Sequence, residues 1–318
     1  MTVARVFSGR GYVSPETREK VLAAARKLNY RPNPLARGLR GGSTGSIGVI
    51  WQLLHPEMNA KMAGDIVMAI RQRSHTPYLI PQTNEQETLL PALDDLHLRG
   101  VDGLVMQIAP KMLAQPEVQD ALSVFPVLVI VTMRPVEIPC DLIVHDRRPG
   151  FREAAEYFVS QGRKRLGFLG GRRGNNTKFQ AYSSVANEHA DVSVEMIGIE
   201  GEQEGITGLD AVRTLDSNYA DSDLPFDAIL AANDELAMAL MHWLRQKQIS
   251  VPDTIAVSGV NDSDICDFQS PPLASIIRRD DEVLTTALEM LYQRLENPKG
   301  PREVKTINMT FQPRESAG

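Results

Sequence analysis

The fold is decided by two apolar runs, SIGVIWQL at residues 46–53 and RLGFLG at residues 165–170. Both runs are nearly continuous in large apolar residues instead of alternating with polar ones, which is typical of parallel strands covered by helices on both faces. Each run is followed by a loop, a helical stretch and another strand. Because this series starts twice, the sequence predicts two doubly wound lobes instead of one wide sheet.

The rest of the chain after residue 46 repeats the same strand–helix unit. We expect further strands at 77–82, 101–108, 126–132, 142–145, 193–199, 227–232, 254–260 and 273–277, and helices at 58–73, 86–99, 150–161, 178–190, 204–217, 233–248 and 280–296. In parallel sheets, ligands bind beyond the carboxyl ends of the strands. The loops after residues 50, 170, 232 and 260 are therefore expected to line a cleft between the lobes.

Length and composition fit this architecture. At about 150 residues per domain, 318 residues predict two domains, and 42% hydrophobic residues supply ample core. No window approaches the roughly 18–20 apolar residues of a membrane span, and the basic N-terminus lacks the apolar segment of a signal peptide. Cys140 and Cys266 lie far apart, which indicates buried thiols. We expect a cytoplasmic protein with no membrane contact.

The charge distribution is uneven along the chain. Residues 1–45 carry nine basic and two acidic side chains, a net charge of +7. Because the whole chain has a net charge of −6, the remaining residues carry −13. A small basic head on a large acidic body indicates a nucleic-acid contact joined to a separate module. The alternative is a solvated basic helix face without a partner.

Two short helices are expected in the basic head. Ser14 can cap the first, with Pro15 at its first position and Glu16 near the positive end of the helix dipole. The second covers about two turns within residues 33–42, and a helix this short is marginal in water unless something holds it.

The second head helix carries Leu35 and Leu39 on one face, flanked by Arg37 and Arg40. Leucines between arginines suit insertion into a DNA minor groove, where apolar side chains unstack a base step. The alternative for this segment is a flexible linker whose leucines touch the body.

Several motifs together resemble the lac repressor family of DNA-binding regulators. In the head they are TVARV (2–6), GYVS (11–14), TREKV (17–21), LNYRPNPLAR (28–37) and GSIGVI (45–50); in the body they are RGVDGL (99–104), RLGFLG (165–170), ANDELA (232–237) and SPPL (270–273). The resemblance covers essentially the whole chain. It implies a helix-turn-helix head, a hinge helix and a two-lobed, periplasmic-binding-protein-like body.

The expected fold class is therefore α/β, with two doubly wound parallel-sheet lobes preceded by a small, partial, all-α helix-turn-helix head and a hinge helix. The expected domains are the partial head at 1–30, the hinge helix and linker at 31–45, the N-terminal lobe at 46–144 plus 276–303, and the C-terminal lobe at 145–275 plus 304–318.

The resemblance also implies the DNA-binding residues Thr2, Arg5, Ser14, Thr17, Asn33, Ala36 and Leu39. Arg5 would face the major groove, where arginine pairs with guanine, and Leu39 would be the minor-groove wedge. Ser14 and Thr17 would touch phosphates. The match starts in the middle of the recognition helix, without the helix that braces it against DNA. We expect either a start further upstream or a loss of autonomous DNA binding.

The expected effector pocket departs from the sugar-binding pattern of the family. Its candidate residues are Trp51, Thr177, Phe179, Asn233, Asn261 and Arg278, with Arg172 and Arg173 as further candidates. Phe179 stands where sugar-binding relatives carry an arginine, and Asn261 replaces the usual acid. A pocket that is more cationic and apolar predicts an anionic or aromatic ligand instead of a neutral sugar. The alternative is a degenerate pocket in which Arg172 and Arg173 form a solvated turn.

No catalytic motif is supported by its context. The sequence GGSTG at 41–45 ends a helix before a strand, whereas a nucleophile elbow follows a strand and opens a helix. There is no phosphate-binding glycine loop, and the histidines lack metal-ligand spacing. We expect no enzyme, no cofactor and no metal.

These expectations combine into a ligand-responsive, DNA-binding transcription regulator of the repressor type. It would bind a palindromic operator as a homodimer. A small molecule in the interlobe cleft would control it by changing the relative rotation of the lobes. The alternative function is a cytosolic solute-binding module, or a regulator remnant that has lost autonomous DNA binding.

Overall fold

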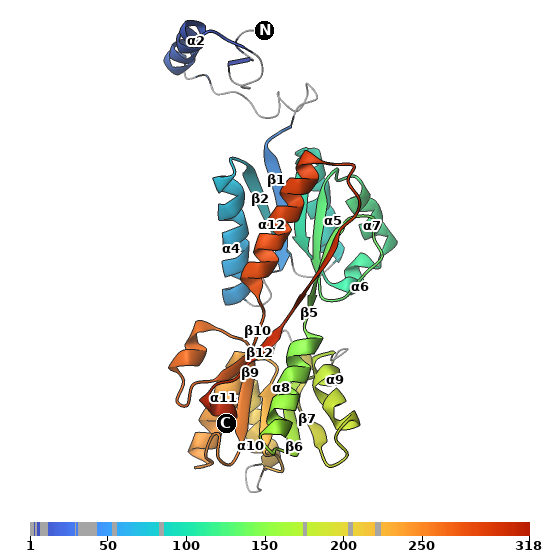
Figure 1. Ribbon diagram of the computed structural model, residues 1–318, viewed down its shortest axis with the longest axis vertical. Helices are drawn as coiled ribbons and strands as arrows, with labels where there is room; N and C mark the ends of the chain where they lie inside the picture. Colours follow the sequence, from blue (N-terminus) through green and yellow to red (C-terminus); the bar gives the residue numbers. More distant parts are fainter. Residues whose placement is uncertain are drawn as a thin grey trace.

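The structure is a computed structural model that describes residues 3, 5–6, 12–28, 30, 43–52, 56–82, 86–173, 177–202, 206–219 and 224–318 (Figure 1). Helix α2 (Pro15–Lys27) belongs to the head. The body consists of two α/β lobes, each built on one six-stranded sheet. The predicted division into two doubly wound lobes is confirmed.

The first sheet has the strand order β11-β5-β4-β3-β1-β2, and every pair in it is parallel. Its strands are β1 (Ser46–Gln52), β2 (Thr76–Gln82), β3 (Gly103–Gln107), β4 (Leu128–Thr132), β5 (Asp141–Asp146) and β11 (Val304–Asn308). One face packs on α4 (Pro56–Gln72) and α12 (Asp280–Glu296), the other on α5 (Gln86–Leu98), α6 (Pro110–Leu113) and α7 (Pro116–Ser123). Because both faces are covered, its central strands are apolar throughout.

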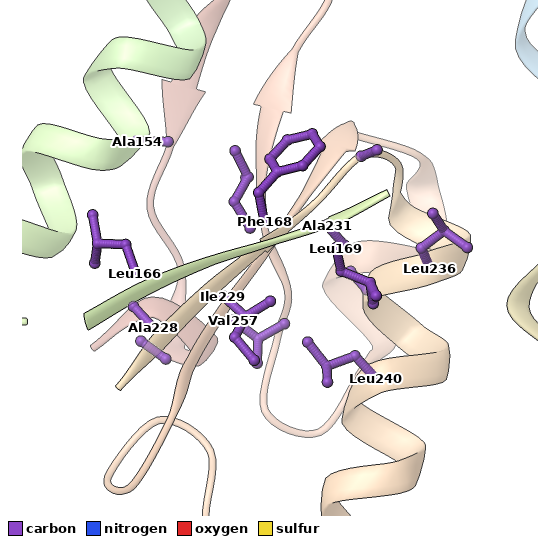
Figure 2. Packing of buried hydrophobic residues seen from close by; sticks show 14 of the residues in the cluster. Ala154, Leu166, Phe168, Leu169, Ala228, Ile229, Ala231, Leu236, Leu240 and Val257 are labelled. Atoms are coloured by element: carbon purple, nitrogen blue, oxygen red, sulfur yellow. The ribbon is translucent and has the colours of Figure 1, made fainter. Parts of the chain in front are cut away.

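The second sheet has the order β12-β10-β9-β8-β6-β7. Its strands are β6 (Arg165–Arg173), β7 (Ser193–Glu202), β8 (Ala228–Ala231), β9 (Ala256–Asn261), β10 (Ala274–Ile277) and β12 (Thr310–Gln312); its helices are α8 (Arg148–Ser160), α9 (Thr177–Ser183), α10 (Gly208–Tyr219) and α11 (Asp234–Gln246). Figure 2 shows Leu166 and Phe168 of β6 in the core with Ile229, Val257 and Leu240. These side chains are fully buried and hold the sheet between its helices.

The C-terminal region differs from the prediction. The strands β11 and β12 were not expected, and β11 joins the first sheet beside β5, although residues 304–318 were assigned to the second lobe. In β11 only Ile307 is buried, so this edge strand carries no continuous apolar run that a sequence pattern could detect. Strand β12 runs antiparallel to β10, so the second sheet is not wholly parallel.

The other two expected lobe boundaries each divide a strand. The boundary at 144/145 lies inside β5, which continues to Asp146 in the first sheet, and the boundary at 275/276 lies inside β10 of the second sheet. Each of these strands is hydrogen-bonded along its length within one sheet. The two lobe boundaries therefore lie at the strand ends, after Asp146 and after Ile277.

The chain crosses between the lobes three times. The crossings follow β5 at Asp146, follow β10 at Arg278, and follow β11 at Met309 (Figure 1). The Met309 N–H donates to the Asp146 carbonyl oxygen at 2.8 Å, and His145 Nε2 pairs with the Arg278 carbonyl oxygen. The three crossings are therefore hydrogen-bonded to one another and form one hinge.

Candidate functional site

The carboxyl edges of the two sheets face each other across this hinge. Strand β5 leaves the first sheet toward the second lobe, and β10 leaves the second sheet toward the first (Figure 1). All other strands of the first sheet run parallel to β5, and β6 to β9 run parallel to β10. The structure thus places four predicted effector-binding residues at or just after strand ends on these two edges: Trp51, Asn233, Asn261 and Arg278. Thr177 and Phe179 lie in α9, the helix that follows β6.

Six buried polar side-chain atoms lack a hydrogen-bond partner among the described residues; those on Gln115, Arg163 and Tyr182 lie elsewhere, and the other three lie at the carboxyl edge of the first sheet. These three are Trp51 Nε1, Gln107 Oε1 and Thr132 Oγ1, at the carboxyl ends of the neighbouring strands β1, β3 and β4. Their residues are 0%, 4% and 1% exposed. Leaving a buried polar group unpaired costs about 1–3 kcal/mol, and such groups call for a partner. A polar ligand or water at this edge would satisfy them.

Sequence reasoning selected Trp51 but missed Gln107 and Thr132. Both stand at the ends of predicted strands, at 101–108 and 126–132, and a polar residue that closes a buried apolar run at the ligand edge was the available signal. In the structure Trp51 is also part of the core between the sheet, α4 and α12.

The hinge supplies two buried ionisable groups, His145 and Arg278. Burial and the nearby Arg278 guanidinium lower the pKa of His145 to about 4, so its imidazole is neutral at pH 7 and donates from Nε2 to the Arg278 carbonyl oxygen. Arg278 is 7% exposed, and its Nε lies 3.1 Å from Asp280 Oδ1. Arg278, the cation that was predicted for the cleft, therefore forms an ion pair with Asp280.

The wall from the second lobe is formed by the start of α9 and the loops after β8 and β9. Phe179 packs against Phe168, with 5.8 Å between ring centroids. Lys178 Nζ donates to the Ala232 carbonyl oxygen at 2.8 Å, which brings the start of α9, including Thr177, beside the loop after β8. In that loop Asn233 Oδ1 accepts the Leu236 N–H at 2.8 Å and caps α11. Part of the predicted ligand-binding capacity of Asn233 is therefore used by the fold.

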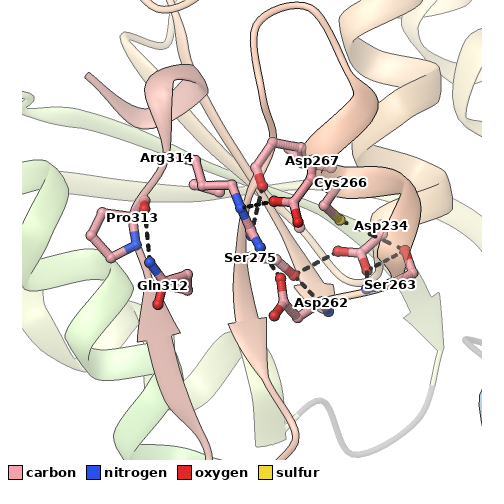
Figure 3. A network of polar contacts seen from close by, with 12 residues as sticks. Asp234, Asp262, Ser263, Cys266, Asp267, Ser275, Gln312, Pro313 and Arg314 are labelled. Atoms are coloured by element: carbon pink, nitrogen blue, oxygen red, sulfur yellow. Dashed lines mark hydrogen bonds and ion pairs between the residues drawn. The ribbon is translucent and has the colours of Figure 1, made fainter.

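The loop after β9 is strained and firmly held (Figure 3). Asn261 and Asp262 have φ values of 114° and 57°, in the left-handed region that side chains other than glycine rarely adopt. The Ser275 hydroxyl accepts the Asp262 N–H at 3.0 Å and donates to Asp234 at 2.6 Å. Arg314 pairs with Asp262 at 2.6 Å, so the C-terminal segment also fixes this loop. Such strain persists only where the surroundings impose it, and it is common at binding sites.

The two further candidates after β6 do not both point to the cleft. Arg172 lies in β6, is exposed and pairs with Glu200 of β7 at 3.3 Å. The side chain of Arg173 lies outside the described residues. The pair Arg172–Glu200 supports the alternative that this arginine is a solvated surface residue.

The head helix begins as predicted. Ser14 caps α2, its Oγ accepting the Thr17 N–H at 3.4 Å and donating to Thr17 Oγ1 at 2.8 Å, and Pro15 opens the helix. Arg5 is exposed. Four predicted DNA-binding residues lie outside the described residues: Thr2, Asn33, Ala36 and Leu39. A phosphate contact of Ser14 and Thr17 stays a prediction.

The junction between the linker and the body is anchored by Asp102. Its carboxylate accepts the Ser43 hydroxyl at 2.7 Å and the backbone N–H groups of Thr44, Gly45 and Ser46 at 2.9, 2.6 and 3.2 Å. Asp102 directly precedes β3. The linker is therefore fastened to the amino edge of the first sheet, opposite the cleft.

No group of side chains suited to a metal ion is found among the described residues, and none of the helices described there is long and apolar enough to cross a membrane.

Two family descriptions match this chain. Residues 155–317 match "Periplasmic binding protein-like domain", and residues 1–33 match "Bacterial regulatory proteins, lacI family". The chain is 27% identical over 312 residues to the HTH-type transcriptional repressor PurR of Mannheimia succiniciproducens, covering 96% of this chain and 91% of that protein. It is 26% identical over 301 residues to the ribose operon repressor of Escherichia coli (strain K12), covering 93% and 89%.

Solved structures agree in fold. The lac repressor dimer bound to operator and the anti-inducer ONPF superposes with a TM-score of 0.82 at 21% identity, over 99% of this chain and 94% of that one. A complex of the transcriptional regulator CelR with cellobiose gives a TM-score of 0.67 at 23% identity, over 99% and 95%.

Two sheets with opposed carboxyl edges and a three-segment hinge define a ligand-binding body, and the chain belongs to the periplasmic binding protein-like family. The head places this body in a narrower group. The chain is a transcription regulator of the lacI family, which confirms the resemblance found in its sequence.

The Asp102 anchor predicts a local effect of substitution. Asp102→Ala removes the acceptor of three amides, so we expect the amides of residues 44–46 to exchange with deuterium about tenfold faster or more, because each lost hydrogen bond contributes about 1 kcal/mol. Hydrogen–deuterium exchange with mass spectrometry measures this. The matched control is Asp95→Ala, which breaks an exposed pair with Arg99 in the same lobe. Unchanged exchange at 44–46 in the Asp102 variant would contradict the anchor.

The His145 environment predicts a pH dependence of stability. The unfolded chain protonates this imidazole below about pH 6.5, whereas the folded chain does so only near pH 4, so stability falls as the pH drops through this window. From pH 7 to pH 5 the loss attributable to His145 is about 2 kcal/mol. We expect His145→Gln to flatten the pH dependence of urea unfolding by that amount. His242→Gln, at an exposed site on α11, is the control and should leave the slope unchanged; equal slopes in both variants would refute the assignment.

Proposed function

We propose that this chain represses transcription by binding a palindromic operator as a homodimer, and that a small molecule in the interlobe cleft controls this binding without any catalytic step. The observation that carries the proposal is the row of unpartnered polar atoms on Trp51, Gln107 and Thr132 at the cleft edge of a chain with a lacI-type head. Such a protein would act in the cytoplasm, where its operator lies.

The geometry supports a rotation of the lobes as the response to ligand. The lobes are joined only through the hinge at Asp146, Arg278 and Met309 in the described part of the chain, and a ligand held by both walls would draw the two edges together. The linker leaves the first lobe at Asp102. In a dimer, a rotation of the first lobe changes the separation of the two linkers and thus the fit of the two heads to their half-sites.

We further propose an anionic or aromatic ligand instead of a neutral sugar. The names of similar proteins include a ribose operon repressor and a cellobiose complex. In this chain, however, the half-buried Phe179, which packs on the core residue Phe168, stands in place of the family's sugar-binding arginine, and Arg278, paired with Asp280, places a buried cation at the hinge. An aromatic ring or a carboxylate suits these groups better than a set of sugar hydroxyls.

A second copy of the chain fits an apolar surface that spans both lobes. Met68 of α4, Leu79 of β2, Ile265 and Phe268 are 58%, 41%, 48% and 83% exposed. In Figure 1, α4, β2 and the orange segment around residues 264–268 lie on the same side of the molecule. Large exposed apolar residues on one face are typical of a subunit interface. We propose this surface, defined by these four residues, as the dimer interface.

Selection of bound duplexes from a random DNA library tests the operator proposal on the chain itself. We expect enrichment of two-fold symmetric sequences and binding that weakens steeply with salt. Arg5→Ala should lower the affinity at least tenfold and relax the base preference, since a good arginine–guanine pair contributes about 1–3 kcal/mol. Arg213→Ala, on α10 of the second lobe, is the control and should bind as the unchanged chain does. If no duplex is enriched, the solute-binding alternative is favoured.

The same chain tests the ligand class by calorimetry against aromatic acids, sugar phosphates, organic acids and neutral hexoses. We expect binding within the first three groups and a change in operator affinity on binding. Tight binding of a neutral hexose would overturn the proposed ligand class without affecting the operator proposal.

The dimer interface predicts the effect of a charge at its most exposed residue. Phe268→Glu replaces an apolar contact by a carboxylate that would lose its water, so we expect monomers at concentrations where the unchanged chain is dimeric. Sedimentation velocity measures the change. The control is Val124→Glu, which alters a 48% exposed apolar residue just after α7, on the other side of Figure 1. A dimer that persists in Phe268→Glu would exclude this surface.

A further inference from the structure

A second cavity lies in the first lobe, at the edge opposite the interlobe cleft. It has a volume of about 270 Å³ and is enclosed by α7, the starts of β4 and β5, and the loop after α12. Its apolar lining includes Leu122, Phe125, Leu128, Ile138 and Pro298. Because β4 and β5 begin here and end at the cleft, a molecule in this cavity cannot touch the ligand site between the lobes.

Two arginines line the cavity, and they differ in how their charges are compensated. Arg294 is neutralised within the fold, because its Nε and Nη2 lie 2.8 and 2.7 Å from the two carboxylate oxygens of Asp141. Arg302 donates from Nε to the Cys140 carbonyl oxygen at 2.9 Å and from Nη2 to the Val136 carbonyl oxygen at 3.0 Å. No ion pair joins Arg302 to a carboxylate in the part of the chain that the structure describes.

The two backbone contacts give the Arg302 guanidinium a fixed orientation. A planar guanidinium held through Nε and Nη2 keeps the N–H groups of Nη1 and the second N–H of Nη2 at its end, in a geometry that pairs with a carboxylate. The carbonyl oxygens that hold it carry only partial charge, so the positive charge of Arg302 stays uncompensated. An anion placed beside it would gain a charge-assisted hydrogen bond.

The other polar residues of the lining carry no charge that opposes an anion: Gln119 and Ser123 are neutral, and so is Cys140. Burial raises the pKa of the Cys140 thiol to about 12, so the thiol is neutral at pH 7 and lines the cavity as a small apolar group. The Asp141 carboxylate is held by Arg294. The charge that an entering ligand meets is therefore the single positive charge of Arg302.

Size and polarity then restrict the ligand. A cavity of about 150 Å³ holds benzene, so about 270 Å³ holds roughly ten non-hydrogen atoms. The apolar lining favours a ring or a branched hydrocarbon, and one cation favours one negative charge.

We propose that this cavity, bounded by α7 and Arg302, is a second ligand site that binds a compact hydrophobic monocarboxylate. The site lies on the same amino edge of the first sheet as the Asp102 anchor of the linker. Phe125 of the lining also packs edge-on against His97 at the end of α5, three residues before Gly100, whose carbonyl oxygen accepts the Thr44 hydroxyl. The proposal is independent of the operator and of the cleft ligand.

Titration of the chain with 3-phenylpropanoate and with its neutral analogue 3-phenylpropanamide tests the site. We expect the carboxylate to bind at least tenfold more tightly than the amide. Arg302→Gln should remove this preference while leaving the amide affinity unchanged, and Arg213→Gln on α10, the control, should keep it. If the carboxylate binds in the interlobe cleft instead, Arg302→Gln will bind it normally, and the proposal fails.

A cavity-filling variant provides a second, independent readout. Leu128→Trp at the start of β4 places a larger ring in the cavity and should abolish the preference for the carboxylate that Arg302 confers. Circular dichroism and thermal unfolding establish that this variant is folded. A carboxylate preference that persists in folded Leu128→Trp, or absence of binding to the unchanged chain, would overturn the site. Neither result depends on whether the chain binds an operator.

Discussion

The hydrogen bonds that join the three crossing segments are the constraint on which the two-lobed arrangement depends. Met309 donates to the Asp146 carbonyl, and His145 pairs with the Arg278 carbonyl. At Gly150 an added Cβ would lie 2.7 Å from Ile276 Cγ2 and 3.0 Å from the Met309 carbonyl carbon, so the segments approach as closely as glycine permits. This tight packing holds the three crossing segments together as one hinge.

Buried polar groups differ in whether the described residues supply their hydrogen-bond partners. Asp234 is 4% exposed and accepts three hydrogen bonds from Ser263 and Ser275, which offset the cost of its burial although that burial still raises its pKa. Trp51, Gln107 and Thr132 are equally buried, yet their polar atoms have no partner. Gln115, Arg163 and Tyr182 also carry such atoms, at scattered positions, whereas the three at the first sheet's carboxyl edge lie on neighbouring strands. It is this clustering that supports the proposed ligand contact there.

The sequence predicted the parts of the fold that depend on local pattern. Continuous apolar runs gave the central strands, and Ser14 followed by Pro15 gave the start of α2, because both signals lie within a few residues. Long-range pairing left no such signal. Strand β11 buries only Ile307 and finds its place through β5, more than 150 residues away. The resemblance predicted that Arg278 and Asn233 bind the ligand. It did not predict that Arg278 pairs with Asp280. Nor did it predict that the Asn233 side chain caps α11.

Strand β3 links the two functional edges of the first lobe. Asp102, which holds the linker, immediately precedes it, and Gln107, with its unpaired amide oxygen, ends it. The strand between them is buried at every position, and at about 3.3 Å per residue it spans roughly 17 Å. So short a strand, paired on both sides, cannot bend independently of its neighbours. In the proposed function, a ligand contact at Gln107 therefore reaches the linker through movement of the first lobe as a whole, as a change in how the two lobes are oriented.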